Sequence, residues 1–320
     1  NENNKMKDLR IVFMGTPDFA VGILDTLIKE NYNVVGVITA PDRPAGRGRK
    51  LNESAVKKYA QEKELTILQP KNLKDEGFLN TLQQLRANLQ IVVAFRMLPK
   101  VVWEMPTYGT FNLHASLLPQ YRGAAPINWA IMNGEIKTGV TTFFIDEKID
   151  TGAIILQEEA PIHIDDNAEA LHDRLMDLGA NLVVKTAERI KKGDFKTTIQ
   201  NNDRDLKLAY KLHRDTCKIN WQKPIKDIYN FIRGLSPYPG AWSTLHNADE
   251  ELLMKIFKVE LEIEKHNLEI GRLVFNKKEL KIVVDSGYLN LLEIQLQGKK
   301  RMLIGDVLNG LQLTENAFVS

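Results

Sequence analysis

The first part of the chain alternates between short apolar runs and longer stretches whose hydrophobic residues recur every three or four positions. The apolar runs predict buried strands, at 9–15, 33–39, 66–68, 89–99, 111–114 and 138–145. The periodic stretches predict helices, at 17–29, 53–63, 75–86, 126–134 and 168–192. Because strands that alternate with helices are typical of α/β proteins, we predict a doubly wound, mostly parallel, Rossmann-like sheet.

The last third of the chain has a different pattern, with short apolar segments separated by turn residues. We predict one helix at 225–235 and strands at 241–245, 253–263, 270–275, 280–284 and 289–296. Several short strands with turns between them indicate a small β-barrel. A polar segment, 193–207, separates the two patterns. The predicted organisation is therefore an α/β domain at 1–195, a linker at 196–212 and a barrel domain at 213–320.

The stretch FNLHASLLPQYRG (111–123) combines a short strand with a Pro-containing turn and a loop. Side chains two residues apart on a strand point the same way, so Asn112 and His114 project together from the carboxyl end of this strand. Open α/β sheets bind ligands at that edge. A lone Asn-x-His pair is more often part of an ordinary core beside a hydrophobic turn, so its interpretation depends on neighbouring residues.

Asp150 lies about three dozen residues downstream, in an acidic loop after the strand predicted at 138–145. Together, Asn112, His114 and Asp150 would suit acyl transfer without a nucleophile from the protein. Asn112 can donate a hydrogen bond to a developing oxyanion, and His114 can share that role or move a proton. Asp150 can fix the imidazole tautomer and raise its basicity. Taken alone, Asp150 could equally be a solvated turn residue.

A basic segment follows the second predicted strand. Its sequence, PDRPAGRGRK, holds four cations in eight residues, namely Arg43, Arg47, Arg49 and Lys50. The intervening Pro44, Gly46 and Gly48 predict a long mobile loop without regular structure. Composition alone favours a solvated charge run with no partner.

Composition sets broad limits on the class of protein. With 320 residues, 43% hydrophobic and 26% charged, the chain can bury a sizeable core. A net charge of +2 neither supports nor excludes a nucleic-acid partner, because a local patch is enough to bind one. Cys217 is the only cysteine, which excludes an intramolecular disulfide and suits a reducing cytosol. No signal peptide or bilayer-spanning run is visible, so we expect a cytoplasmic protein with no membrane partner.

Two kinds of cofactor chemistry are not predicted. The turn after the first strand contains only Gly15 and lacks the G-x-G-x-x-G pattern, so a nicotinamide-dependent dehydrogenase loses its main support. The histidines lack the spacing of zinc ligands, and acyl transfer needs only carbonyl polarisation and proton movement. We therefore predict no metal.

The motifs N-x-H, SLLP and Y-R-G, followed by the Asp of D-T-G, resemble those of the folate-dependent formyltransferase family. The resemblance covers nearly the whole chain, including GTPDFA, PDRPAGRGRK, AFRMLP and the arrangement of the carboxyl-terminal third. It implies a Rossmann-like formyltransferase domain followed by an OB-like domain that helps to hold tRNA. The sequence AFRML departs from the Tyr-Gly pair that is commonest in the tRNA-acting members, and it looks more like the purine-pathway enzyme.

The resemblance also implies a formyl donor, 10-formyltetrahydrofolate, and residues that bind it. Its pterin ring would enter the loop at 94–99, and the SLLP turn would line the same site. The implied folate-binding residues are Phe95, Arg96, Met97, Leu98, Ser116, Leu117, Leu118, Pro119 and Asp146. From composition alone, the side chains of Phe95, Met97 and Leu98 are expected to be ordinary core. In tRNA-acting members the segment matching Arg43, Arg47, Arg49 and Lys50 enters the acceptor end of the tRNA, which reverses the interpretation of the charge run.

We therefore predict an enzyme that transfers a formyl group to the α-amino group of methionine on initiator tRNA, for translation initiation. We expect it to act as a monomer. Three alternatives share part of the pattern: a formyltransferase that acts on a small amine, a formyltetrahydrofolate hydrolase with water as acceptor, and a non-catalytic RNA-binding module. The intact Asn112, His114 and Asp150 constellation disfavours the last of these.

Overall fold

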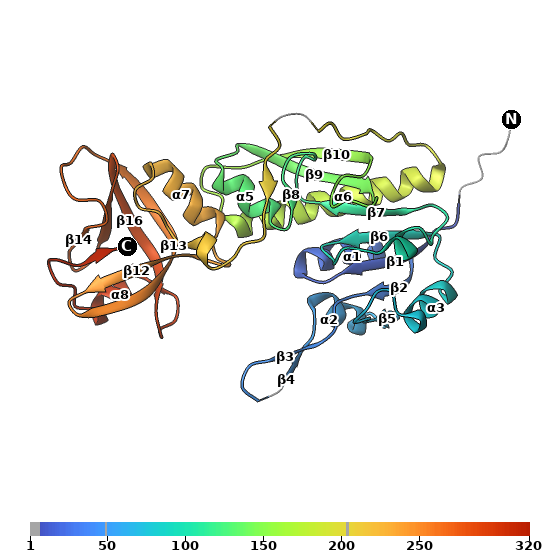
Figure 1. Ribbon diagram of the computed structural model, residues 1–320, viewed down its shortest axis with the longest axis horizontal. Helices are drawn as coiled ribbons and strands as arrows, with labels where there is room; N and C mark the ends of the chain where they lie inside the picture. The colour runs from blue at the N-terminus through green and yellow to red at the C-terminus, as the bar shows by residue number, and fades with distance from the viewer. Residues whose placement is uncertain (1–6, 49, 203–204) are drawn as a thin grey trace. The chain divides into compact units, whose positions relative to one another are not determined.

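The computed structural model describes residues 7–48, 50–202 and 205–320 (Figure 1). The described chain forms two compact units. The N-terminal unit comprises residues 1–123, 138–161 and 172–208, and the C-terminal unit comprises residues 124–137, 162–171 and 209–320. Each unit is built around its own seven-stranded sheet. Within the described residues, no helix is both long enough and apolar enough to cross a membrane.

The sheet of the N-terminal unit has the strand order β10-β9-β7-β6-β1-β2-β5. Its strands are β1 (Arg10–Gly15), β2 (Asn33–Ile38), β5 (Ile67–Leu68), β6 (Leu89–Val93), β7 (Thr110–His114), β9 (Lys137–Phe144) and β10 (Ile154–Pro161). From β5 to β7 all neighbours are parallel, and β9 then pairs antiparallel with β7. The predicted mostly parallel, doubly wound sheet is confirmed.

The winding of this sheet reverses next to β1. The chain moves from β1 to β2 and β5 on one side, then crosses to β6 and β7 on the other. In such sheets, ligands bind where the direction reverses, at the carboxyl ends of the strands. Val93, at the end of β6, pairs with both Gly15 of β1 and Leu113 of β7. The strand ends are therefore level, and His114 emerges beside them.

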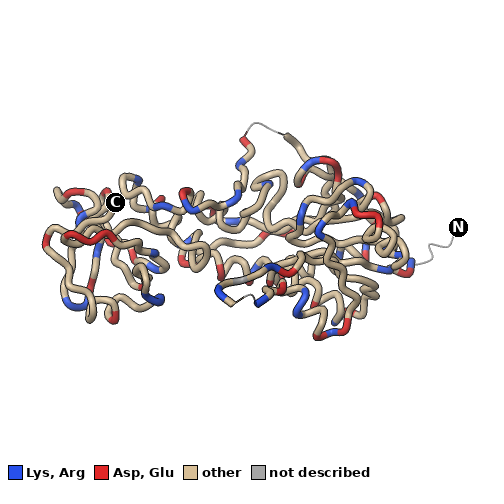
Figure 2. The backbone as a smooth tube through the Cα atoms, turned by 60° about the horizontal axis from the view of Figure 1, so that its bottom comes forward, with Lys and Arg blue, Asp and Glu red and all other residues tan. Residues whose placement is uncertain are grey.

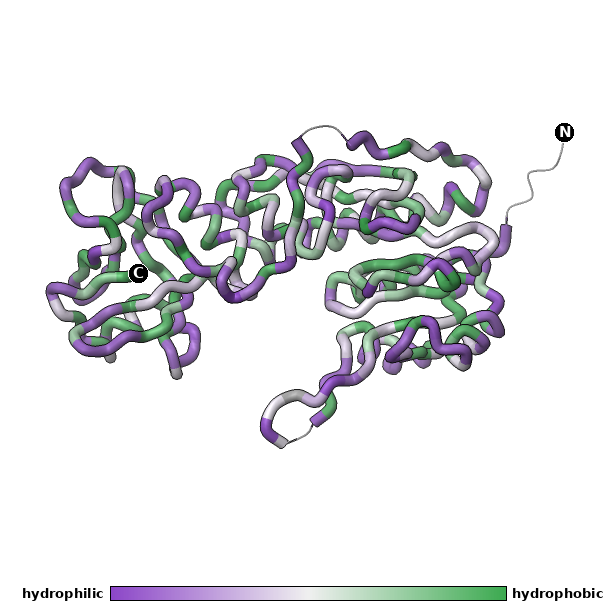
Figure 3. Tube along the Cα trace, viewed as in Figure 1, coloured by the Kyte–Doolittle hydropathy of each residue, from purple (hydrophilic) through white to green (hydrophobic). Residues whose placement is uncertain are grey.

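Helices cover both faces of the sheet. They are α1 (Asp18–Lys29), α2 (Ala55–Glu62), α3 (Glu76–Gln84), α4 (Lys100–Trp103) and α6 (Ala168–Lys192). On one face, α1 and α6 meet at Gly22 and Met176. On the other, an apolar cluster joins Val12 and Val92 of the strands to Phe78 of α3. The strands between these layers are predominantly green, that is hydrophobic, in Figure 3, because both of their faces are covered.

Local sequence signals explain where elements begin and end. The side chains of Asp75 and Asn167 each accept a hydrogen bond from the backbone N–H three residues later, and so cap α3 and α6. Ser54 caps α2 by accepting a hydrogen bond from Lys57 N at 3.0 Å, so this helix begins two residues later than predicted. The strand predicted at 89–99 ends at Val93, because Ala94 adopts a left-handed φ of 50° that interrupts the extended backbone.

The basic segment is a β-hairpin, which corrects the prediction of a loop without regular structure. Strand β3 (Arg43–Ala45) pairs antiparallel with β4 (Lys50–Asn52), and the ribbon extends away from the central sheet (Figure 1). Gly46 and Gly48 have positive φ values of 70° and 119°. Tight hairpin turns require such values, so the glycines make the turn instead of preventing the strands. Arg49 lies outside the described residues.

The C-terminal unit is a nearly closed antiparallel barrel, as predicted. Its strands, β12 (Ala241–Asn247), β13 (Glu250–Ile263), β14 (Leu273–Phe275), β15 (Leu280–Val284), β16 (Gly287–Leu296) and β18 (Phe318–Val319), have the order β14-β15-β16-β13-β12-β18. The seventh strand, β17 (Met302–Leu303), pairs with β16 outside this order. Leu273 N donates to Ala317 O at 3.3 Å, and Val319 N donates to Gly271 O at 2.9 Å. These bonds join the two ends of the sheet and close the barrel.

Short elements complete the chain. They are β8 (Arg122–Gly123), β11 (Leu208–Ala209), the 3-10 helix η1 (Asp215–Cys217), β17 (Met302–Leu303) and α8 (Ile304–Gly310). None of these was predicted, because each is too short to show a hydrophobic period. Helix α7 (Ile225–Gly234) was predicted, and its buried isoleucines face the barrel strands β13 and β16.

One helix from the middle of the chain belongs to the C-terminal unit. Helix α5 (Pro126–Met132) packs against α7. Asn128 Nδ2 donates to Gly234 O at 2.9 Å, and a Cβ at position 234 would lie 2.6 Å from the Met132 side chain. Glycine at 234 therefore allows the two helices to approach closely. The compact units thus interleave along the sequence, whereas the boundaries proposed from the sequence follow chain order.

The segment predicted as a linker at 196–212 is bound to the N-terminal unit over its first half. Thr198 and Ile154 exchange two backbone hydrogen bonds, at 2.8 and 2.9 Å. Tyr121 N donates to Lys207 O at 2.7 Å. The side chain of Gln200 is buried within the same unit. This part of the segment therefore has fixed partners along the loops that follow β7 and β9.

Candidate active site

His114 is the last residue of β7 and is buried, with 7% of its surface exposed. Its Nε2 lies 2.7 Å from the backbone carbonyl oxygen of Tyr121. A carbonyl oxygen only accepts hydrogen bonds, so this contact places a proton on Nε2. Tyr121, and not Asp150 as predicted from the sequence, therefore fixes the tautomer. Nδ1 remains as the ring atom that can take up or release a proton.

Asp150 approaches that second ring nitrogen. Its Oδ2 is 3.8 Å from His114 Nδ1 and accepts a hydrogen bond from Gly123 N at 3.0 Å. Both side chains are about nine-tenths buried, so water screens their interaction weakly. The carboxylate is therefore placed to stabilise a positive charge on the imidazole. The structure brings together His114 and Asp150, which the sequence analysis grouped from motifs far apart in the chain.

The loop that carries Asp150 has a constrained backbone. Strand β9 runs antiparallel to β7, so its last residue, Phe144, lies beside the first half of β7. Asp150 has a left-handed φ of 56°, which costs a non-glycine residue about 1–2 kcal/mol. At Gly152 a Cβ would lie 1.6 Å from the Phe144 carbonyl oxygen, so only glycine fits there. The loop thus packs closely against β9 at Gly152, and its Asp150 side chain faces His114.

Asn112 precedes His114 by two residues and shares its face of β7. Its side-chain Oδ1 is buried and has no hydrogen-bond partner among the described residues. A buried polar atom without a partner costs about 1–3 kcal/mol. Such atoms are rare in folded proteins and often mark positions that a ligand completes. The amide therefore fits a site that receives a polar group.

The SLLP turn is held by side chains from the neighbouring strands. Thr141 Oγ1 donates to Ser116 O at 2.7 Å, and Gln157 Nε2 donates to Leu118 O at 2.8 Å. The Leu118–Pro119 peptide bond is cis. Ser116 Oγ donates to the carbonyl oxygen of Gln120 at 2.6 Å. Because that hydroxyl is buried and bonded to a carbonyl, and no base contacts it, Ser116 is not arranged as a nucleophile.

The segment after β6 lies at the ligand-binding edge of the sheet and has no regular structure over 94–99. Leu98 is buried and Phe95 is partly buried in the apolar cluster, as expected for core side chains. Met97 is 61% exposed, so it is not a core residue as the composition suggested. Arg96 stacks on Phe95 and donates to the Pro70 carbonyl at 2.8 Å. This hydrogen bond and the contact with the Phe95 ring hold Arg96 in place.

Asp146 organises its own loop. Its Oδ1 accepts hydrogen bonds from Lys148 N at 3.0 Å and from Thr151 Oγ1 at 2.7 Å. These contacts are typical of an aspartate that closes a turn. Asp146 is partly exposed, and its proposed part in folate binding stays a prediction.

Two residues that the sequence analysis did not assign connect these loops. Arg122 Nε donates to the Asp150 carbonyl oxygen at 3.1 Å, and its Nη2 donates to Gln200 Oε1 at 2.8 Å. Gln200 Nε2 donates in turn to the carbonyl oxygens of Asp150 and Gly152, at 2.9 and 2.8 Å. Arg122 stands in the Y-R-G motif, which could have drawn attention to it. No sequence signal marks Gln200, a polar residue in a polar segment.

Two protein-family models match this chain. A family model described as formyl transferase matches residues 9–187, more than half of the chain, and a model described as formyl transferase, C-terminal domain, matches residues 211–312. The chain belongs to the formyl transferase family. The resemblance noted in the sequence is thereby confirmed.

Named relatives of this formyl transferase extend over nearly its whole length. It is 62% identical over 314 residues to the methionyl-tRNA formyltransferase of Flavobacterium johnsoniae, covering 98% of this chain and 100% of the relative. It is 53% identical over 316 residues to the methionyl-tRNA formyltransferase of Bacteroides thetaiotaomicron, covering 97% and 98%.

Solved structures share the fold of this formyl transferase. An N-formyltransferase from Helicobacter canadensis, in complex with folinic acid and dTDP-3-aminofucose, superposes with a TM-score of 0.63 at 22% identity, covering 92% of this chain and 100% of that one. The HypX protein of Aquifex aeolicus, in complex with tetrahydrofolic acid, gives 0.64 at 18% identity, covering 96% of this chain and 49% of that one. At such identities the likeness shows the fold alone.

The β3–β4 hairpin of this formyl transferase presents its described cations to solvent. Arg43, Arg47 and Lys50 are exposed. At the base, Lys57 Nζ lies 2.6 Å from Asp42 Oδ2, and this bond holds the pKa of Asp42 below its usual value. Burial lowers the pKa of Arg96, and the positive charge of Arg43 lowers it further. Over the rest of the chain drawn in Figure 2, basic and acidic residues are interspersed.

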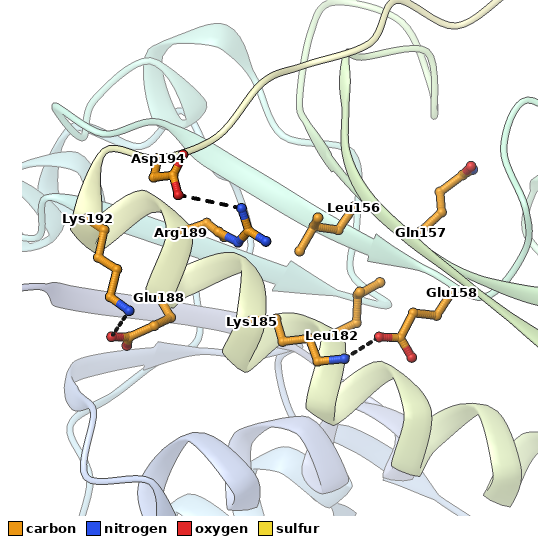
Figure 4. A pocket seen from close by; sticks show the side chains of 9 residues that line it. All are labelled: Leu156, Gln157, Glu158, Leu182, Lys185, Glu188, Arg189, Lys192 and Asp194. Carbon is orange, nitrogen blue, oxygen red and sulfur yellow. Dashed lines mark hydrogen bonds and ion pairs between the residues drawn. The ribbon is translucent and has the colours of Figure 1, made fainter.

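A surface pocket of about 630 Å³ lies apart from this site, between β10 and α6 (Figure 4). Its cations are each matched by an acid, in the pairs Lys185–Glu158, Arg189–Asp194 and Lys192–Glu188. The pocket is not lined by Asn112, His114 or Asp150. Within the described residues, no cluster of His, Cys, Asp or Glu is arranged to hold a metal ion.

Proposed function

We propose that this formyl transferase moves the formyl group of 10-formyltetrahydrofolate to the α-amino group of methionine on initiator tRNA. The observation that carries the proposal is the 62% identity, over 98% of the chain, to a protein named methionyl-tRNA formyltransferase. The match spans both compact units and the hairpin, so it concerns the acceptor as well as the chemistry. The product would be N-formylmethionyl-tRNA, which is used in translation initiation.

The residues around His114 fit a folate donor with a transferable formyl group. The irregular segment at 94–99 offers backbone groups and the side chains of Phe95 and Met97, which suit a flat heterocycle. The cis-proline turn at Ser116–Pro119 supplies a second wall, with Leu117 and Leu118, beside β7. Asn112 offers a buried amide, whose partnerless oxygen can accept a hydrogen bond from the attacking amine. We assign the pterin ring to the first segment and the formyl group to the region of Asn112 and His114.

We assign separate roles to the three polar side chains. The amine nitrogen forms a bond to the formyl carbon, the bond from that carbon to folate N10 breaks, and one proton passes from the amine to N10. His114 Nδ1 accepts this proton and returns it, because Nε2 is engaged by Tyr121. Asp150, 3.8 Å away, stabilises the imidazolium. Asn112 donates from its amide to the oxyanion, and such a preorganised donor is worth about a hundred- to thousand-fold in rate.

We assign acceptor binding to the hairpin. Arg43, Arg47 and Lys50 are exposed on a narrow ribbon, where they can contact phosphate groups from several directions. Arginine is suited to this because its planar guanidinium can bind phosphate with two hydrogen bonds or stack on an unpaired base. In the tRNA-acting members of the family that the sequence resembles, the matching segment enters the acceptor end of the tRNA. Arg49 is included in the proposal from the sequence alone.

The proposal is tested by comparing acceptors. Purified protein is supplied with 10-formyltetrahydrofolate and, in parallel, charged initiator tRNA, free methionine or water alone. We expect rapid formylation of the charged tRNA and little reaction with the other two. Equal use of free methionine would indicate an enzyme for small amines. Release of formate without an acceptor, at the rate of the tRNA reaction, would indicate a folate hydrolase.

A further inference from the structure

Gln200 is a buried amide that joins three separate parts of the chain. It is 6% exposed and lies between the regions matched by the two family models, 9–187 and 211–312. Its side chain makes hydrogen bonds to Arg122, which follows the SLLP turn, and to the loop that carries Asp150. A polar side chain in a connecting segment would ordinarily be solvated, so its burial requires fixed partners.

Its partners determine which way the amide points. The guanidinium of Arg122 only donates hydrogen bonds, so the Gln200 oxygen must face it, at 2.8 Å from Nη2. The carbonyl oxygens of Asp150 and Gly152 only accept, so the Gln200 nitrogen must face them, at 2.9 and 2.8 Å. The oxygen and both amide hydrogens are thus used in a single orientation. A carboxylate or an apolar side chain cannot reproduce this set of contacts.

The contacts act on the backbone of Asp150, next to its carboxylate. Arg122 Nε also donates to the Asp150 carbonyl, so this oxygen receives two hydrogen bonds. They hold a residue with a left-handed φ of 56°, which residues other than glycine adopt only occasionally. Gly123, the neighbour of Arg122, donates its N–H to the Asp150 carboxylate. The backbone and the side chain of Asp150 are therefore both bonded to the loop that holds Arg122 and Gly123. Gln200 is bonded to Arg122 and to Asp150.

From this arrangement we infer that Gln200 is a positioning residue for the formyl transfer, and that it acts through Asp150. It holds the 150–152 loop and Arg122 in the arrangement that keeps the Asp150 carboxylate facing His114 Nδ1. The inference rests on the proposed function of the site. It adds that the segment after the α/β domain, which neither family model covers, takes part in the chemistry.

Three substitutions test the inference by separating kcat from KM. Gln200→Ala removes all three contacts, and Gln200→Met removes them while nearly preserving the volume. Gln200→Glu keeps an acceptor for Arg122 but removes the donor to the Asp150 and Gly152 carbonyls. We expect each variant to lower kcat by about tenfold to a hundredfold, the range for a misplaced catalytic group. KM for the folate donor should change by less than about threefold, because the Phe95 to Leu98 segment is untouched.

Asn202→Ala is the matched control. Its Oδ1 accepts from Arg122 Nη2 at 3.1 Å, but among the described residues its side chain makes no hydrogen bond to the 150–152 loop. We expect this variant to keep kcat within about twofold of the wild type. An equal loss in Asn202→Ala and Gln200→Ala would overturn the inference, because any weakened contact to Arg122 would then suffice. Full activity in Gln200→Glu would overturn it as well, because Gln200 would then serve only to hold Arg122.

A double-mutant cycle tests whether Gln200 acts through Asp150. In an Asp150→Asn background the carboxylate is already absent, so adding Gln200→Ala or Gln200→Met should lower kcat by less than about threefold more. If the fold losses in kcat of the two single variants multiply in the double variant, Gln200 acts independently of Asp150. That outcome would overturn the inference. Formyl transfer by the wild type is measured alongside. An inactive wild type would contradict the proposed function, whereas an active wild type with unimpaired variants would contradict the role of Gln200 alone.

Discussion

The loops around His114 and the β3–β4 hairpin both carry charged side chains, yet they are built in opposite ways. At His114 the ionisable groups are buried and held by hydrogen bonds between segments far apart in the sequence. In the hairpin the described cations are exposed, and an ion pair at the base, Lys57–Asp42, secures it to helix α2. Buried groups that are oriented in advance suit the stabilisation of a transition state. Exposed cations suit an extended polyanion, for which no single contact is decisive.

At the buried site, we expect substitutions to lower turnover steeply, and by the same factor at low and high salt. Asn112→Ala and His114→Ala should each lower turnover by about a hundred- to thousand-fold, and Asp150→Asn by a similar factor. Single-turnover measurements with saturating donor and tRNA report this loss. Binding of the donor should stay close to wild type, because the Phe95 to Leu98 segment and the SLLP turn are untouched. The Tm is measured alongside, and we expect it to fall most in His114→Ala, which leaves a cavity at a buried position. Wild-type turnover in any of the three variants would remove that residue from the site.

A second prediction concerns the backbone that supports the buried site. Gly152→Ala would place a methyl group within 1.6 Å of the Phe144 carbonyl oxygen, so the Asp150 loop must shift. We expect turnover to fall by about tenfold or more and the free energy of unfolding to fall by about 1–3 kcal/mol.

The control for Gly152→Ala is Gly305→Ala in α8, where nothing lies within 4 Å of the added methyl group. This change should leave turnover unaltered and raise the free energy of unfolding by up to about 1 kcal/mol, as alanine does in a helix. Normal activity in Gly152→Ala would mean that the close contact with Phe144 does not position the loop.

At the hairpin we expect graded losses that depend on salt. Arg47→Ala with Lys50→Ala should weaken tRNA use at physiological salt. The log–log salt dependence should flatten by roughly 0.7 to 0.9 for each phosphate group that the variant no longer neutralises. KM for the folate donor should be unchanged. Arg43 is left in place because its charge reaches Arg96, beside the proposed donor site.

The matched control removes two exposed cations of α2 and its end, by Lys58→Ala with Lys63→Ala. It changes the net charge equally but leaves the hairpin intact, so the salt slope should stay within experimental error. If the hairpin variant and this control show the same slope, the hairpin is an ordinary solvated charge run.

The smallest effect is expected at Ser116. Ser116→Ala removes the hydroxyl that donates to Gln120, while the bond from Thr141 to the Ser116 carbonyl remains. The SLLP turn should persist, and we expect a change of only about two- to fivefold in the KM for the donor, in keeping with the removal of one hydrogen bond. Mass spectrometry of protein incubated with the donor alone should find no formylated enzyme. A covalent formyl adduct at Ser116 would refute direct transfer.

Much of the fold follows from hydrophobic patterning. Continuous apolar runs identify the parallel strands, because each of these strands packs against helices on both faces of the sheet. The hairpin escaped prediction because its strands are three residues long and its pairing depends on the turn conformations of Gly46 and Gly48. The same two glycines are compatible with an unstructured loop, and only the antiparallel pairing of 43–45 with 50–52 distinguishes a hairpin from such a loop.

The site was predictable in part, for different reasons at each residue. Asn112 and His114 share a face by the period of a strand, which the sequence reveals directly. Asp150 could be grouped with His114 because each follows a predicted strand, but its approach depends on β9 running antiparallel to β7, which the hydrophobic pattern does not reveal. Gln200 could not be found, because its burial results from contacts with residues about fifty positions away and leaves no pattern in its own segment.

The pairing of α5 with α7 has a consequence for the synthesis of the chain. More than ninety residues separate the end of α5 at Met132 from the start of α7 at Ile225. At a translation rate of about 5–20 residues per second, α5 emerges roughly 5–20 s before its partner. During that interval Ala130 and Ile131, which are buried in the finished protein, have no α7 to cover them. A nascent chain is therefore exposed to aggregation or chaperone capture at α5 until the ribosome has delivered the later helix.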